Sequence, residues 1–314
     1  MRPHEQAEFY SKRVCAAPTI DFSFSPCSSV VSGALSEDGS SFTGAATVME
    51  DRRLTNPANS SETPRDRTQT GTAQPSLLSI VIPVYNEEAY LAAVIRKVAH
   101  QPLPGGLERE IIMVNDASTD GTWSVMEALP AQYPHIRFEL INKPVNQGKG
   151  AAMRDAWAAA RGDILIIQDA DFEYDPADYP KLLEPILQGK ADVVFGSRFI
   201  GEPHRVMYFW HQLANNFLTT FSNMLTNLNL TDMEVCYKVF TREVYSRITI
   251  KSPRFGVEPE LTAKVARLRL NGRHVRVYET GVAYAGRTYE EGKKIGWRDA
   301  VSAIIQIIRF RFFD

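Results

Sequence analysis

Residues 77–85, LLSIVIPVY, form an apolar run that is followed, after Asn86, by EEAYLAAVIRKVAH, residues 87–100. In the second stretch the apolar residues recur with the period of one helix face, namely Leu91, Val94, Ile95 and Val98. A short apolar run bounded by turn residues is typical of a buried strand. The two stretches therefore predict a buried strand followed by an amphipathic helix.

The same strand–helix unit recurs along the next hundred residues. Further apolar runs are EIIMV, IRFELI, DILIIQ and ADVVFGSR, which begin at residues 110, 136, 163 and 191. Helical patterns follow the first three, near 123–129, at 151–161 and from Asp175-Pro176 onward. Continuous apolar strands that alternate with helices indicate a mostly parallel sheet covered on both faces, so we expect an α/β fold.

The chain outside this region divides differently. Residues 1–76 are rich in Ser, Thr, Pro and charge and lack an apolar stretch of signal-peptide length, so we expect a disordered segment, or upstream sequence if Met49 is the start. We expect a catalytic domain over 77–290 and an amphipathic helix over 291–314. The three cysteines lie far apart with no C-x-x-C spacing, which disfavours disulfides or structural zinc and fits a reducing cytoplasm.

Charge is polarised along the chain. The net charge is −2 over residues 1–76, −6 over 77–199 and +6 over 200–314. An acidic region suits a bound cation, whereas a basic region suits phosphates or an anionic membrane surface. Because the basic residues are dispersed and no reader module is present, we expect no nucleic-acid binding.

The stretch IIQDADFEYDP, residues 166–176, places carboxylates directly after a predicted buried strand. Side chains alternate along an extended chain, so Asp169 and Asp171 point the same way. Two such carboxylates can hold Mg²⁺ or Mn²⁺, which would in turn bind a diphosphate. The pattern D-x-D by itself also occurs in solvated turns and helix caps.

Polar residues follow the other predicted strands, where the carboxyl ends of a parallel sheet form a ligand crevice. They are Tyr85, Asn86 and Glu87, then Asn115, Asp116 and Ser118, then NQGKG at 146–150. Asp116 could accept a hydrogen bond from a nucleotide base or cap the following helix, for which Ser118 or Asp120 is better suited. The NQGKG stretch could approach phosphate oxygens or form only a tight turn.

Five motifs occur in a characteristic order: SIVIPVYNEE, IIMVNDASTDGT, NQGKGAAMRDA, IIQDAD and VVFGSRF. Together they resemble the catalytic domain of glycosyltransferase family 2, which has the GT-A fold, over residues 77 to about 200. The resemblance implies an inverting transfer from a nucleotide-diphosphate sugar of the UDP-glucose or GDP-mannose type. It also implies nucleotide-binding residues, a donor-site lysine and a metal pair, which are Pro83, Tyr85, Glu87 and Asp116, then Lys149, then Asp169 and Asp171.

The second half resembles the polyprenyl-phosphate and dolichyl-phosphate hexose synthases. The matching stretches are GSRF, TDMEVCYKVF and GRTYEEGKKIGWRD, which begin at residues 196, 231 and 286. The resemblance implies a polyprenyl phosphate acceptor with phosphate-gathering elements around it, here Arg198, Asp232 with Lys238, and Arg287 with Lys293 and Lys294. One departure is Cys236-Tyr237 in place of the usual Gly-Phe, and Glu234 adds a carboxylate.

Two acceptor chemistries remain open. A phosphate monoester is already anionic near neutral pH and needs cations rather than a base. A sugar or glycolipid hydroxyl needs a general base, for which Asp232 or Glu234 is the candidate. A third hypothesis is a non-catalytic sugar-nucleotide sensor or membrane scaffold. We predict as catalytic residues Asp171, Arg198, Asp232, Glu234, Arg287 and Lys293.

Two aromatic-rich stretches bear on the location of the protein. They are Val206–Leu230 and the tail AVSAIIQIIRFRFF, residues 300–313. Neither approaches ~18 uninterrupted apolar residues, so we predict no transmembrane helix. Either stretch could lie in the bilayer interface or dock on the domain or on a second subunit. We expect a cytoplasmic protein that is peripheral on the cytoplasmic face of a membrane and able to form a homo-oligomer.

Overall fold

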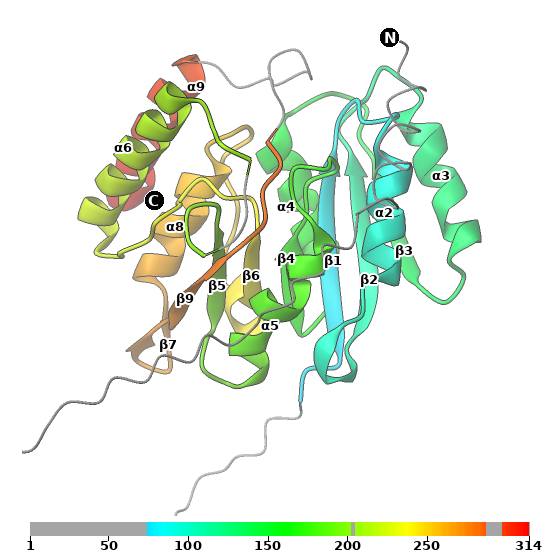
Figure 1. Cartoon of the computed structure of the whole chain (residues 1–314), viewed down its shortest axis with the longest axis horizontal. Coiled ribbons are helices and arrows are strands. Elements are labelled where there is room, and N and C mark those ends of the chain that lie inside the picture. The colour runs from blue at the N-terminus through cyan, green and yellow to red at the C-terminus, as the bar shows by residue number, and fades with distance from the viewer. Residues whose placement is uncertain (1–73, 202–204, 287–296, 314) are drawn as a thin grey trace, which may run out of the picture. The chain divides into compact units, whose positions relative to one another are not determined.

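The structure is a computed structural model that describes residues 74–201, 205–286 and 297–313, with side chains from residue 300 onward in the last segment. Its main feature is a seven-stranded sheet in the order β3-β2-β1-β4-β6-β5-β9 (Figure 1). The strands are β1 (Leu77–Val84), β2 (Glu108–Asn115), β3 (Arg137–Asn142), β4 (Ile164–Ile167), β5 (Val193–Ser197), β6 (Lys238–Thr241) and β9 (Val277–Gly281). The segment predicted over 1–76 falls almost entirely outside the described residues.

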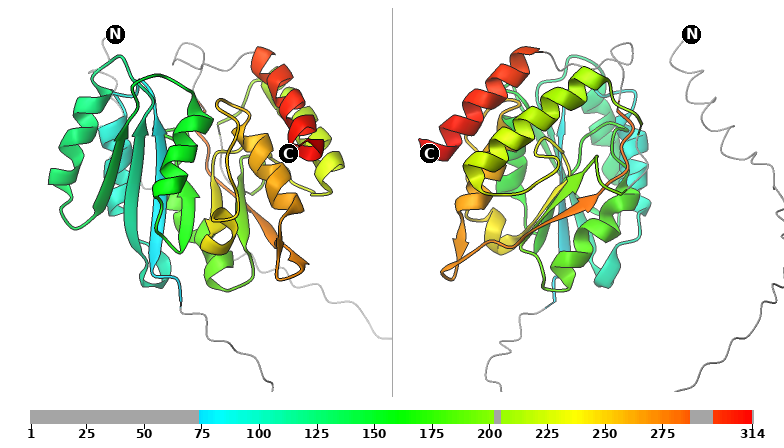
Figure 2. Two further views of the ribbon diagram at one scale, coloured as in Figure 1. Left: turned by 180° about the vertical axis from the view of Figure 1, so that it is seen from behind. Right: turned by 60° about the vertical axis from the view of Figure 1, so that its left-hand side comes forward.

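The sheet is mostly parallel. Strand β1 pairs in parallel with β2 and with β4, and β2 pairs in parallel with β3. Strand β6 is antiparallel to both of its neighbours, β4 and β5, while β9 is parallel to β5. The central strands are buried along most of their length because helices cover both faces, which confirms the α/β prediction (Figures 1 and 2).

Helices connect the strands. They are α2 (Leu91–His100), α3 (Thr122–Gln132), α4 (Lys149–Ala159), α5 (Tyr179–Leu187), α6 (Phe209–Thr226), α7 (Arg242–Tyr245), α8 (Val257–Arg267) and α9 (Trp297–Phe312). Short 3-10 turns η1 (Pro104–Gly106) and η2 (Pro176–Asp178) precede β2 and α5, and a small hairpin joins β7 (Arg269–Leu270) to β8 (Arg273–His274). In the described segments, no helix has the length and hydropathy of a membrane span.

Candidate functional site

The predicted site residues lie where the strand order reverses. The chain passes from β1 outward through β2 to β3, then returns to the other side of β1 as β4. Carboxyl ends of parallel strands next to such a reversal form a crevice. Tyr85 and Glu87 follow β1, Asp116 follows β2, and Asp169 and Asp171 follow β4. The topology therefore places these residues together at the carboxyl ends of the parallel strands.

Lys149, at the start of α4, connects the first of the two aspartates to a third carboxylate. Its Nζ lies 3.0 Å from Asp169 Oδ1 and 3.0 Å from Glu258 Oε1, in the first turn of α8. Burial lowers the pKa of the Lys149 ammonium, but Asp169 and Glu258 raise it well above its ordinary value. Lys149 therefore stays charged beside the carboxylate that the sequence predicts as a metal ligand.

The donor set after β4 is suitable for a hard divalent cation. Asp171 accepts a hydrogen bond from the backbone N–H of Glu173 at 3.0 Å, which fixes its carboxylate in a turn. Asp175 is engaged elsewhere, since it accepts from the backbone of Ala177 and pairs with Lys97 at 2.7 Å. No group of three or more His, Cys, Asp or Glu in the described part of the chain could hold a metal. A cation at this pair would therefore need ligands from the donor phosphates.

Asp116 holds the turn before α4. Its carboxylate is 2% exposed and accepts hydrogen bonds from the backbone N–H groups of Gln147 at 3.0 Å and Gly148 at 2.6 Å. The N-cap of α3 is Gly121, and Asp120 before it accepts from the backbone N–H of Thr122, the first residue of the helix, at 3.1 Å. Binding of a nucleotide base by Asp116 stays a prediction.

The two glycines of NQGKG allow the chain 252–254 to approach. A Cβ on Gly150 would lie 2.1 Å from the Ser252 carbonyl oxygen, and one on Gly148 would lie 2.6 Å from that of Pro253. Gly148 also has a φ of 96°, which favours glycine. Because the Gly148 N–H donates to Asp116 and the Ala151 N–H to Pro253, the geometry supports the tight turn more than a phosphate cradle.

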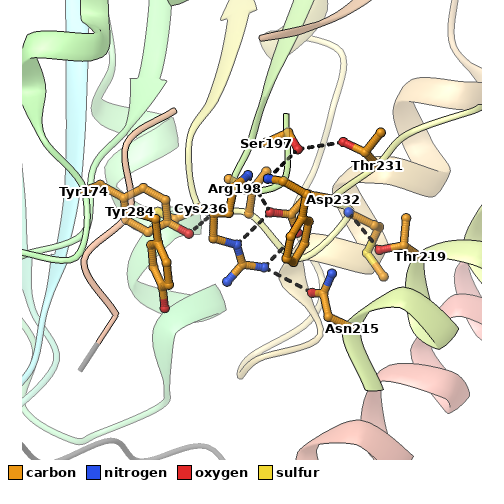
Figure 3. Close-up of polar contacts among 12 residues, drawn as sticks. Tyr174, Ser197, Arg198, Asn215, Thr219, Thr231, Asp232, Cys236 and Tyr284 are labelled. Carbon is orange, nitrogen blue, oxygen red and sulfur yellow. Dashed lines mark hydrogen bonds and ion pairs between the residues drawn. The ribbon is translucent and has the colours of Figure 1, made fainter. Parts of the chain in front are cut away.

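Arg198, which follows β5, is fixed by a buried carboxylate. Its Nε and Nη2 donate to the two oxygens of Asp232 at 2.6 and 2.7 Å, and its backbone N–H donates to the same group at 3.1 Å. Nη2 also donates to Asn215 Oδ1 of α6 at 3.1 Å, and the guanidinium lies 5.1 Å from the ring centroid of Tyr284 (Figure 3). Asp232 is fully buried. Burial lowers the pKa of the Arg198 guanidinium, but the neighbouring Asp232 carboxylate raises it. The net result is a pKa well above the ordinary value for arginine.

Glu234 is half-buried, and its Oε1 is buried without a hydrogen-bonding partner among the described residues. Burial, followed by the neighbouring carboxylate of Glu258, raises the pKa of Glu234 to about 8. The raised pKa favours the protonated form of Glu234 near neutral pH.

The position of Lys238 differs from what the resemblance implied. The resemblance grouped Lys238 with the cations around the acceptor phosphate. It is fully buried, and its Nζ donates to the carbonyl oxygens of Met233, at 3.0 Å, and Val235. Burial lowers its pKa. Lys238 therefore fixes its own loop. Cys236 is buried, as a small core residue would be.

The structure brings the predicted residues together in two groups. In the first group Lys149 pairs with Asp169, and in the second Arg198 pairs with Asp232. The charges of Arg198 and Asp232 also affect the pKa of Glu234, which belongs to the second group. The predicted residues Arg287 and Lys293, and also Lys294, lie outside the described residues. Their approach to the site stays a prediction.

Four residues of the site were not predicted from sequence, namely Gln168, Asn215, Glu258 and Tyr284. Gln168 is fully buried and accepts hydrogen bonds from two tyrosine hydroxyls, at 2.7 and 2.8 Å, directly before Asp169. Asn215 offered a signal, because it is a polar residue in an aromatic-rich helix. Glu258 had no signal in the sequence other than its position in a predicted helix.

The sheet order and the carboxylate pair after β4 agree with the GT-A fold of glycosyltransferases that the motifs predicted. Residues 79–249, more than half of the chain, match the family described as Glycosyl transferase family 2. The chain belongs to that family, as the sequence motifs predicted.

Curated relatives carry lipid-phosphate transferase names. An undecaprenyl-phosphate 4-deoxy-4-formamido-L-arabinose transferase of Aeromonas hydrophila is 28% identical over 69% of this chain and 62% of its own length. A dolichol-phosphate mannosyltransferase of Pyrococcus furiosus is 32% identical over 39% and 33%, respectively. An undecaprenyl-phosphate mannosyltransferase of Micrococcus luteus is 28% identical over 69% and 86%. The chain thus spans less than two thirds of the first two relatives.

Solved structures support the fold. Glucosyl-3-phosphoglycerate synthase of Mycobacterium tuberculosis in complex with phosphoglyceric acid superposes with a TM-score of 0.57, at 22% identity, over 75% of this chain and 80% of that one. The same enzyme with Mn²⁺, UDP-glucose and phosphoglyceric acid gives a TM-score of 0.55 at 22% identity, over 75% and 80%. The GT-A prediction is confirmed.

Proposed function

We propose that the chain transfers a hexose, glucose or mannose, from a nucleotide-diphosphate sugar to a polyprenyl phosphate with inversion at the anomeric carbon. The names of the relatives from Aeromonas, Pyrococcus and Micrococcus support a lipid-phosphate acceptor. The solved Mycobacterium enzyme, which binds UDP-glucose and Mn²⁺, supports a nucleotide-sugar donor and a divalent metal.

On the donor side, Asp169 and Asp171 would hold Mg²⁺ or Mn²⁺ together with the donor diphosphate. When bound, such a metal offsets the negative charge that develops on the leaving nucleoside diphosphate. Lys149 brings a second fixed positive charge to the same carboxylate, at 3.0 Å from Asp169. Tyr85, Glu87 and Asp116 would line the nucleotide side, since all follow β1 or β2 at the same edge.

The state of two carboxyl groups is the observation that carries the acceptor assignment. A hydroxyl acceptor needs a base. Asp232 is fully buried and bonded at both oxygens to Arg198, so it is not positioned to accept a substrate proton. Burial raises the pKa of Glu234 to about 8, which favours its protonated form near neutral pH. A phosphate monoester, which is an anion already, requires neither group as a base.

The acceptor phosphate would meet Arg198. Asp232 holds the guanidinium in one orientation from one side, and Asn215 holds it from another. A fixed guanidinium can bind phosphate oxygens with less loss of side-chain entropy than a mobile one. Arg287 and Lys293, predicted from sequence, would add to this charge. We also propose that the protein acts at the cytoplasmic face of a membrane.

The test is transfer with purified protein and Mn²⁺. Radiolabelled UDP-glucose and GDP-mannose are supplied separately with undecaprenyl phosphate, and the products are extracted into organic solvent. We expect label from one donor in the organic phase. The matched control replaces undecaprenyl phosphate with undecaprenol, which has a hydroxyl in place of the phosphate. Label on undecaprenol, or label that stays in water with every donor, would overturn the phosphate assignment.

Two variants separate the chemical roles. Glu234→Gln should retain turnover, because a protonated carboxyl and an amide are both uncharged. Asp232→Asn should raise the KM for undecaprenyl phosphate, because Arg198 loses the charge that orients it. A collapse of kcat in Glu234→Gln, with donor affinity unchanged, would instead identify Glu234 as a base and favour a hydroxyl acceptor.

A further inference from the structure

Helix α6 buries polar residues and exposes apolar ones, beside an exposed polar strip of Gln212, Asn216 and Thr220. Its buried residues are Asn215, Leu218, Thr219 and Ser222. Its exposed apolar residues include Trp210 at 73%, Leu213 at 48%, Phe217 at 59% and Met224 at 76% exposed. These four recur at spacings of three, four and seven, so they share one side of the helix. A surface helix of a soluble protein has the opposite arrangement.

Helix α9 is apolar on two sides. Ala303, Ile307 and Phe310 are buried. On its other side the exposed apolar residues are Val301, Ile305, Ile308 and Phe312. Ser302 and Arg309 are exposed between these two sides. Exposed apolar residues that gather on one side of a helix indicate a contact surface, and both α9 and α6 have such a side.

The two helices lie side by side, as both views of Figure 2 show. Leu218 of α6 packs with Ala303 and Ile307 of α9 in a small core of their own. Phe221 joins this core, and the ring of Phe217 stacks on Phe221 with centroids 6.3 Å apart. The exposed side of α6 thus adjoins α9. We call the combined surface the α6–α9 face, and it consists of Phe209, Trp210, Leu213, Phe217, Met224, Val301, Ile305, Ile308 and Phe312.

The charged side chains that the structure describes on α6 and α9 have one sign. The sequence of α6 contains no Asp, Glu, Lys or Arg, and α9 from Ala300 onward carries only Arg309 and Arg311. Lys264 does not add to this charge, because its Nζ pairs with Glu260 at 2.6 Å and lies against the buried ring of Phe310. An anionic surface would complement these groups.

A second copy of the chain fits less well than lipid. A two-fold interface places the same patch on both subunits, so each set of arginines would face a surface with no carboxylate among its described side chains. Anionic lipid headgroups supply the opposite charge, while Phe, Trp and Leu side chains suit the boundary between headgroups and acyl chains. Arg side chains can extend from such a face to the headgroups.

We propose that the α6–α9 face docks on an anionic lipid surface. The inference extends the proposed function, because it names the surface that would contact the membrane. It depends on the proposed function only in taking lipid as the partner. The buried side of α6 holds Arg198 through Asn215, at 3.1 Å. Docking would therefore place the acceptor arginine about one helix diameter, ~10 Å, from the lipid surface. A phosphate carried by a membrane lipid could then reach it with its chain still in the membrane.

The experiment is sedimentation of the full chain with vesicles and no sugar nucleotide. One set of vesicles is phosphatidylcholine alone, and the other contains about one third phosphatidylglycerol, whose charge attracts basic residues. The face variant is L213E/F217E. The matched control, A131E/Q132E, adds two carboxylates at exposed positions at the end of α3. Because both side chains of the face variant are exposed, its thermal unfolding midpoint should equal that of the wild type.

We expect binding to the anionic vesicles, reduced by at least about tenfold in L213E/F217E and less than about twofold in the control. An uncharged variant, F217Q/M224Q, should give an intermediate loss, which separates lost apolar contact from added repulsion. Equal binding to both vesicle types, or binding that L213E/F217E leaves unchanged, would overturn the inference.

Light scattering tests the second-copy alternative. A dimer that L213E/F217E dissociates, together with no vesicle binding, would assign the face to self-association and overturn the lipid proposal. Transfer is measured separately with a short-chain polyprenyl phosphate in detergent. Absent transfer with intact vesicle binding would reject the proposed function alone, while intact transfer with no vesicle binding would reject the docking inference alone.

Discussion

The pairing of Arg198 with Asp232 makes a quantitative prediction about stability. Asp232 is fully buried, the Arg198 side chain is 12% exposed, and the two groups meet at 2.6 Å. Removing one member of a buried pair leaves the other charge uncompensated, at a cost of about 3–5 kcal/mol. Asp232→Ala should therefore lower the free energy of unfolding by that amount, a large part of the ~5–15 kcal/mol typical of domains.

A double-mutant cycle separates this interaction from the loss of packing. Arg198→Met alone should also destabilise, because it leaves Asp232 buried without its counter-ion. The double variant, Arg198→Met with Asp232→Ala, removes both charges and should be more stable than the sum of the single losses predicts, by about 2–3 kcal/mol.

The assay is equilibrium unfolding in urea, followed by tryptophan fluorescence and circular dichroism for all four proteins. Coincident transitions justify a two-state treatment. If the single losses add to within about 0.5 kcal/mol, the two groups do not interact appreciably in solution. That result would refute both the predicted coupling and the argument that Asp232 is unavailable as a base.

Three further outcomes are expected. The folded protein holds the Glu234 proton more tightly than the unfolded chain does, so the contribution of Glu234 to stability falls as the pH rises from about 4.5 to about 8. In urea unfolding, the free energy of unfolding of Glu234→Gln should therefore increase relative to that of the wild type across this pH range. An unchanging difference between the two proteins would contradict the raised pKa. Gly150→Ala should destabilise by about 1–3 kcal/mol, because its Cβ would lie 2.1 Å from the Ser252 carbonyl oxygen; an unchanged unfolding midpoint would show that this contact relaxes freely. Asp169→Asn and Asp171→Asn should each weaken Mn²⁺ binding in the presence of UDP by about tenfold or more, measured by calorimetry, and full retention of affinity in both would remove the pair from the metal site.

The parallel part of the fold was predictable because each strand–helix unit is a local pattern. The run 77–85 and the helix after it carry their own periodicity, and so do the units that contain β2 to β5. Strand β6 was not assigned from the sequence. It enters the sheet antiparallel between β4 and β5, although some forty residues separate it from β5 along the chain. Pairing over such a distance leaves no period in a local window.

The site was predictable where residues follow strands and less so elsewhere. Asp169 and Asp171 were located by their strand, whereas Glu258 reaches Lys149 from a helix more than a hundred residues later. The role of Lys238 was wrongly inferred because its positive charge was counted without its burial. Asn215 was visible in the sequence but was given no role, although Asn215, Thr219 and Ser222 recur with helical spacing.

The inverted polarity of α6 has a practical consequence for anyone producing the protein. An apolar outer side invites solubilising substitutions, and positions such as Leu213 and Met224 can accept them without disturbing the interior. Asn215 lies on the buried side of the same helix, and replacing it would remove the hydrogen bond that it accepts from Arg198. Redesign guided by hydropathy alone would treat the apolar side of α6 as the buried one and would place its substitutions on polar residues such as Asn215, which holds Arg198.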